Sequence, residues 1–63
     1  METYYSAKER RAQILQLLKS SPKILVSSLS QMFNISEVTI RKDLEELENR
    51  NLLIRVRGGA IRL

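Results

Sequence analysis

The side chains best suited to polar recognition in this sequence are two adjacent basic residues, Arg41 and Lys42. The planar guanidinium of arginine can pair with guanine O6 and N7 or grip a phosphate, and the lysine ammonium also suits an anionic surface. Between positions 36 and 48 they are the only basic residues, among five acidic ones. A helix face that is merely solvated gives no reason for such a basic pair. The pattern favours contact with double-stranded DNA over a purely solvated role.

The four residues at 36–39 could take part in the same contact. Ser36 and Thr39 could donate hydroxyls to a phosphate near a helix N-terminus, or could only cap that helix. Val38 is apolar on a polar face, so it could meet a thymine methyl group or pack on the preceding helix. Glu37 begins the same helix, and we count all four among the predicted DNA-contacting residues.

Three arginines, Arg55, Arg57 and Arg62, surround the pair Gly58-Gly59. Residues 49–63 carry four basic and no acidic side chains. Such a loop can reach the DNA backbone or the minor groove, or it can be only a solubilising edge that blocks strand pairing. The purely positive charge favours contact by Arg55 and Arg57.

The acidic side chains at 45–48 restrict how the helix can approach DNA. Phosphate would repel them, so the N-terminal half of the helix must enter the groove with 45–48 pointing outward. Asp43 lies beside the apolar stripe, and we expect it to form an internal ion pair with Arg10 or Arg55 and to have no acid or base role.

A helix is predicted over residues 7–19, because Ser6 and Glu9 have the spacing of a capping box and Pro22 stops the helix. Arg11 is expected to stay exposed. The apolar stripe of this helix is predicted to contain Ala7, Ile14, Leu17 and Leu18.

A helix-turn-helix follows. Ser27 is predicted to cap a short helix over 28–33, which Asn34 can end in a left-handed conformation. Ser36 then caps a third helix over 37–50, with Ile40, Leu44 and Leu47 on its inner stripe.

The remaining residues predict a wing. Residues 52–57 and 60–63 can pair as strands around a turn at Gly58-Gly59, and the apolar run at 24–26 could add a third short strand. The predicted fold is mainly α with a small β-hairpin, a winged helix-turn-helix of three helices plus wing, in one domain over residues 1–63.

Composition excludes several function classes. The 63 residues carry a net charge of +4 and include no cysteine and no histidine, which excludes disulfides, thiolate zinc sites and imidazole catalysis. No apolar run approaches the roughly 18 residues that span a bilayer, and the polar start at residues 1–5 is unlike a signal peptide. We expect a cytoplasmic protein that is not an enzyme, with no metal, cofactor or membrane partner.

The spacing of key residues resembles the N-terminal signature of the DeoR family of bacterial transcriptional repressors. Arg10, Ile14 and Leu18 recur at four-residue steps, and a 17-residue gap leads to Ser36-x-x-Thr39-Ile40-Arg41-Lys42-Asp43-Leu44. The match continues through Leu47-Glu48, Arg55 and Gly58-Gly59-Ala60, so it covers about residues 9–61. Asn51 stands where the family usually has glycine, and Arg57 where it often has histidine.

This resemblance implies a repressor of a sugar or nucleoside catabolic operon. It also implies a C-terminal domain, absent from this chain, that senses a phosphorylated sugar and supports a homo-oligomer in the full-length protein. The main hypothesis is sequence-specific binding of double-stranded DNA. The alternative is a winged-helix protein-interaction module, which the acidic stretch at 45–48 favours.

Overall fold

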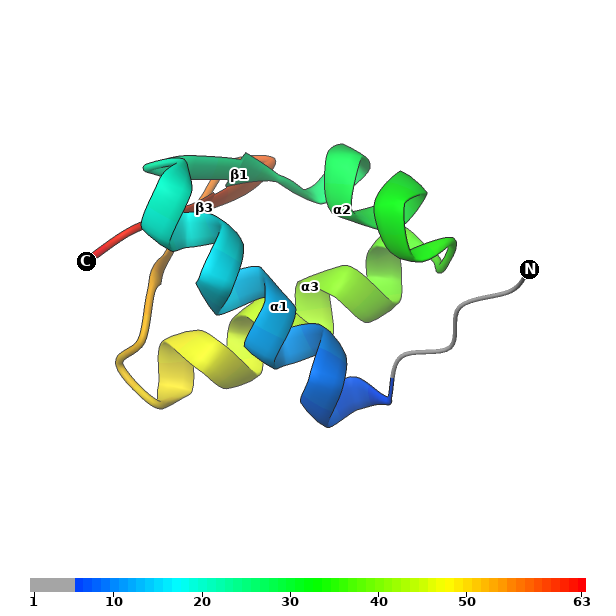
Figure 1. Cartoon of the computed structure of the whole chain (residues 1–63), viewed down its shortest axis with the longest axis horizontal. Helices are drawn as coiled ribbons and strands as arrows, with labels where there is room; N and C mark the ends of the chain where they lie inside the picture. The colour runs from blue at the N-terminus through cyan, green and yellow to red at the C-terminus, as the bar shows by residue number, and fades with distance from the viewer. Residues whose placement is uncertain (1–5) are drawn as a thin grey trace.

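The computed structural model describes residues 6–63. The polar start, from which we predicted the absence of a signal peptide, lies outside this range. Within it the chain forms three helices and a three-stranded antiparallel sheet of order β1-β3-β2, which confirms the predicted winged helix-turn-helix (Figure 1). The elements in chain order are α1 (Ala7–Ser20), β1 (Lys23–Leu25), α2 (Val26–Phe33), α3 (Glu37–Asn49), β2 (Ile54–Val56) and β3 (Gly59–Ile61).

Local signals start and end most helices where expected. The Ser6 side chain accepts from the Glu9 N–H and the Glu9 carboxylate accepts from the Ser6 N–H, so the predicted capping box of α1 is confirmed. Asn34 and Asn51 have φ values of 56° and 61°, the left-handed conformation that ends a helix. Ser36 caps α3.

The predicted start of α2 was wrong. The helix begins at Val26, and its cap residue Leu25 makes no side-chain capping bond, whereas Ser27 was expected to be the cap. The Val26 N–H donates to the Gly58 carbonyl at 2.8 Å. The wing therefore provides an acceptor for the first of the four free N–H groups at the start of α2.

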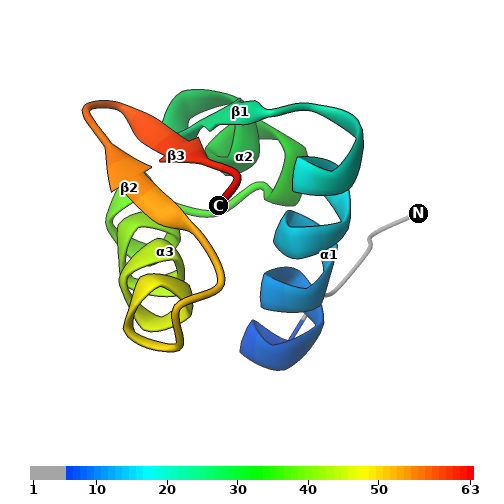
Figure 2. The ribbon, with the colours of Figure 1, turned by 90° about the vertical axis from the view of Figure 1, so that its left-hand side faces the viewer.

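One hydrophobic core is formed by α1, β1, α2, α3, β3 and Leu53, which directly precedes β2. In Figure 2, α3 and β2 lie on one side of the molecule and α1 on the other. The predicted stripe of α1 is only partly correct, because Ile14 and Leu18 are buried whereas Ala7 and Leu17 are half-buried. The buried apolar residues are Ile14, Leu18, Ile24, Val26, Leu29, Phe33, Ile40, Leu44, Leu47, Leu53 and Ala60.

The wing turns one residue earlier than predicted. Its turn residues are Arg57 and Gly58, with Gly58 at a φ of 77°, and Gly59 already belongs to β3. A Cβ on Gly59 would lie 2.0 Å from the Ile24 carbonyl oxygen, so close strand packing requires glycine there. The possible third strand in the apolar run is confirmed as β1, which pairs with β3.

Candidate nucleic-acid interface

The N-terminal half of α3 presents its predicted contact residues to solvent. Val38 is 58% exposed, so this valine does not fill the core against α2. Glu37, Arg41 and Lys42 are exposed as well. An exposed valine at the start of an otherwise polar helix face is available to an apolar group such as a methyl.

The hydroxyls of Ser36 and Thr39 have the capping role that the sequence predicted. The Ser36 hydroxyl accepts from the Thr39 N–H at 3.2 Å and lies 3.1 Å from the Thr39 hydroxyl. Ser36 is exposed and Thr39 is half-buried. The cap thus leaves a polar, accessible helix N-terminus, a place that favours an anion.

Arg41 and Lys42 differ in their surroundings. The Arg41 guanidinium donates to Glu37 Oε1 at 2.9 Å, whereas no ion pair engages Lys42 within residues 6–63. Both partners of the Arg41–Glu37 pair are about half exposed, and such helical pairs contribute only about 0.3–0.5 kcal/mol. An anionic partner can therefore displace Glu37 from Arg41 at little cost.

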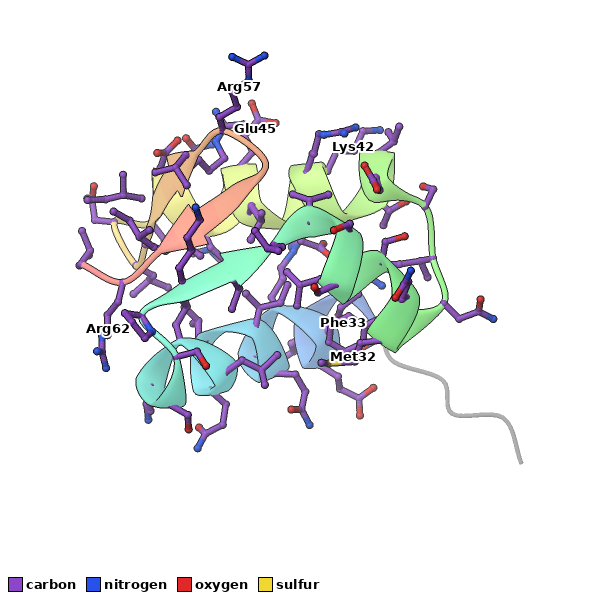
Figure 3. All side chains as sticks on the ribbon, turned by 90° about the horizontal axis from the view of Figure 1, so that it is seen from above. Met32, Phe33, Lys42, Glu45, Arg57 and Arg62 are labelled. Carbon is purple, nitrogen blue, oxygen red and sulfur yellow. The ribbon has the colours of Figure 1, made fainter. Side chains whose placement is uncertain are left out.

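A groove of about 380 Å³ separates α3 from the wing and brings Arg41 together with Arg55 and Arg57. Arg57 and Lys42 extend from the same edge of the molecule, with Glu45 between them (Figure 3). The groove is lined by Val26, Arg41, Leu44, Glu48, Arg55, Val56, Arg57, Gly58 and Gly59. The tertiary fold thus places the two predicted basic clusters side by side.

Arg62 does not belong to this surface, contrary to the predicted clustering of three arginines at the wing tip. It points to the opposite side of the molecule in Figure 3, and its guanidinium donates to the Lys19 carbonyl at 3.0 Å. Lys19 lies in the last turn of α1, where free carbonyls favour a cation. Arg62 directly follows the end of β3, away from the hairpin turn and close to the C-terminal end of α1.

Glu48 has a role that the sequence analysis missed. Its carboxylate accepts from the Arg55 backbone N–H and from Arg55 Nε, both at 2.9 Å. Both bonds lower the pKa of Glu48, and the larger effect comes from the bond to the Arg55 backbone N–H. Part of the acidic stretch at 45–48 therefore ties the wing to α3. The only sequence signal was the opposite charge of two residues seven positions apart, which is too weak to identify the pair.

Asp43 forms the predicted internal ion pair, and its partner is Arg10 and not Arg55. Both Arg10 Nε and Nη2 donate to the two carboxylate oxygens of Asp43. Arg11 Nε donates to Asp43 Oδ1 at 3.0 Å. The prediction that Arg11 is exposed was wrong, because this bond holds its side chain partly buried.

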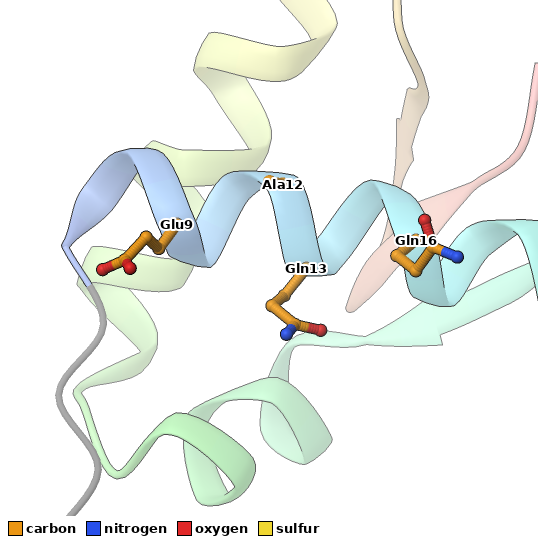
Figure 4. A pocket seen from close by; sticks show the side chains of 4 residues that line it. All are labelled: Glu9, Ala12, Gln13 and Gln16. Atoms are coloured by element: carbon orange, nitrogen blue, oxygen red, sulfur yellow. The ribbon is translucent and has the colours of Figure 1, made fainter.

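A second hollow, of about 350 Å³, lies along the outer side of α1 and is lined by Glu9, Ala12, Gln13 and Gln16 (Figure 4). The described part of the chain has no group of three potential metal-ligating side chains. None of the helices described is both long enough and apolar enough to cross a membrane.

Comparison with known proteins identifies the family. The model of the DeoR-like helix-turn-helix domain matches residues 10–63. The chain is 43% identical over 53 residues to a putative aga operon transcriptional repressor of Escherichia coli O157:H7, covering 84% of this chain and 20% of that protein. It is 42% identical over 55 residues to a putative galactitol utilization operon repressor of Escherichia coli K12, covering 87% of this chain and 49% of that protein.

The lactose phosphotransferase system repressor of Staphylococcus aureus is 36% identical over 52 residues, covering 82% of this chain and 21% of that protein. The chain spans about a fifth of the length of the first relatives that it matches. No solved structure matches it significantly. Since the family model covers almost every residue from the first helix onward, the chain belongs to the family of DeoR-like helix-turn-helix domains.

Proposed function

We propose that this chain binds double-stranded DNA in a sequence-specific manner and serves as the reading domain of a transcriptional regulator. The observation that carries the proposal is the groove between α3 and the wing, which brings Arg41 together with Arg55 and Arg57. In a helix-turn-helix the second helix of the motif lies in the major groove with its N-terminal residues on base edges. That half of α3 is the exposed, basic half.

The side chains divide into two roles. Val38, Arg41 and Lys42 face base edges, where a methyl contact and guanidinium or ammonium donors distinguish base pairs. Ser36 and Thr39 meet a phosphate at the start of α3. Arg55 and Arg57 hold the backbone or the minor groove beside it. Glu37 orients Arg41 through its ion pair and releases it on binding.

The kind of genes that this domain regulates is proposed from the names of its relatives. Relatives of this chain are named as repressors of the aga operon, galactitol utilization and the lactose phosphotransferase system. We propose that this domain represses a carbohydrate catabolic operon in the same way. A phosphorylated-sugar effector and homo-oligomerisation would belong to the longer proteins in which such domains occur, and two linked domains would read two half-sites.

The test begins with selection of bound sites from random duplex DNA, followed by fluorescence anisotropy on the enriched site. We expect the logarithm of the affinity to fall steeply with the logarithm of the salt concentration, by about 0.9 per phosphate neutralised. The double variant Arg41→Ala/Lys42→Ala should lose at least about tenfold in affinity for the selected site, the equivalent of one good base contact.

The matched control is Lys8→Ala/Lys19→Ala, which removes the same charge from exposed positions on α1. It should retain the preference for the selected site. A salt slope near zero, or equal losses in the two double variants, would contradict sequence-specific reading by α3. DNA binding that survives the loss of Arg41 and Lys42 unchanged would instead favour a protein-interaction module.

A further inference from the structure

A buried ionic cluster of Arg10, Arg11 and Asp43 joins α1 to α3. It lies on the inner side of α3, away from the proposed base-contacting residues. Asp43 is 1% exposed and Arg10 is 8% exposed. The Arg10 guanidinium reaches both carboxylate oxygens, and Arg11 adds a third bond to Oδ1 at 3.0 Å. Among the described residues, no buried side-chain nitrogen or oxygen lacks a hydrogen-bond partner. The buried polar atoms of the cluster are therefore satisfied within the protein.

Stability alone does not account for a charged pair at this place. Removing two charges from water offsets much of their attraction, and buried ion pairs can often be replaced by apolar residues of similar volume without loss of stability. The pair differs from apolar packing in its directionality, because a planar guanidinium fork meets a carboxylate in a narrow range of orientations. The burial of the apolar stripe of Ile40, Leu44 and Leu47 is less directional, because the hydrophobic effect has no preferred orientation.

The orientation of α3 about its own axis decides where its reading side chains point. Asp43 directly follows Arg41 and Lys42, and successive residues are about 100° apart around a helix. A side-chain group about 6 Å from the helix axis moves by about 2 Å when the helix rolls by about 20°. Hydrogen bonds to base edges tolerate only a few tenths of an ångström, so such a roll would break them.

We propose that Arg10 and Asp43 are positioning residues that set the roll of α3 against α1 and thereby determine which DNA sequence the domain selects. Neither side chain touches DNA. The inference rests on the proposed function, and it adds a residue of α1 to the determinants of selectivity. Arg11 supports the carboxylate from the partly exposed side.

The experiment replaces the pair by apolar residues of similar shape, Arg10→Met/Asp43→Leu. Unfolding is followed by circular dichroism, and residual dipolar couplings give the orientation of α3 relative to α1 in the DNA-free protein. Affinities are measured for the selected duplex and for a scrambled duplex. Leu18→Val serves as a control, because it disturbs the core of α1 without touching the pair.

We expect a folded double variant with a rolled α3 and at least about tenfold weaker binding to the selected duplex, while the scrambled duplex is bound as before. Leu18→Val should keep the wild-type selectivity. A folded double variant that keeps its selectivity, or that loses it with α3 unmoved, overturns the inference. If the double variant does not fold, Arg10→Lys, which keeps the charge but not the fork, is judged by the same criteria.

Failure of the proposed function has a different signature. A wild-type protein that binds no duplex, or binds every duplex equally, refutes sequence-specific reading. The dipolar couplings then decide the structural half of the inference without DNA. A rolled α3 in the variant supports the positioning role of the pair, and an unmoved α3 overturns it.

Discussion

Gly59 is the position at which a single added methyl group should do most damage. A Cβ there would lie 2.0 Å from the Ile24 carbonyl oxygen, 3.1 Å from its carbonyl carbon and 3.2 Å from the Leu25 Cα. All three are backbone atoms of β1, which cannot rotate away as a side chain could. Because real Cβ contacts essentially never fall below 3.0 Å, Gly59→Ala must push β1 and β3 apart by about 1 Å.

The expected loss follows from this displacement. Overpacking typically costs about 1–3 kcal/mol, and an obstacle made of backbone places the cost near 3 kcal/mol. A domain of this size has a core that supplies only about 3–5 kcal/mol, so most of the free energy of unfolding would be lost. With about 4–8 °C per kcal/mol, the midpoint of thermal unfolding should fall by about 12–24 °C.

Gly58 provides the matched control in the neighbouring position. Its φ of 77° strains any other residue, but a Cβ there meets nothing within 4 Å. Gly58→Ala should therefore cost only about 1–2 kcal/mol, the penalty of the left-handed conformation. Thermal and urea unfolding by circular dichroism compare the two variants. A Gly59→Ala variant as stable as Gly58→Ala would refute a steric need for glycine between β1 and β3.

Two further predictions concern local hydrogen bonds. Because the bonds from Arg55 hold the folded-state pKa of Glu48 below 4.5, its contribution to stability is complete above pH 4.5 and is lost as the pH falls through that lowered pKa. Glu48→Gln should therefore flatten the acid limb of a plot of unfolding midpoint against pH, and superimposable acid limbs would contradict this. Ser6→Ala should lower the free energy of unfolding by about 1 kcal/mol, because it removes the capping box of α1. Ser21→Ala should cost less, because the backbone N–H of Ser21, and not its side chain, caps the other end of α1. Equal unfolding midpoints of the two variants in thermal melts would count against the role of the Ser6 cap.

Features with partners close in the chain were predictable. The capping box joins Ser6 to a residue three positions away, and Ser36 caps α3 over the same distance. The inner face of α3 followed from the helical period, so the exposure of Arg41 and Lys42 on the other face followed as well. For Val38 the sequence left packing on the preceding helix open, and the structure shows it exposed. The DNA-contacting roles of these residues stay predictions, whereas their placement on an accessible surface is confirmed.

Features with partners far along the chain were predictable only in part. The first N–H of α2 donates to a carbonyl 32 residues away, at Gly58, and the partly buried Arg11 donates to the carboxylate of Asp43. Charge alone left Asp43 with two equally good partners, and only the packing of α1 against α3 chose Arg10 over Arg55. The residue types and the helical spacing of the apolar ones thus determine which face of each helix is exposed to solvent. Which distant groups meet is decided by the folded arrangement, because hydrogen bonds and close contacts depend on ångström distances that no spacing in the chain encodes.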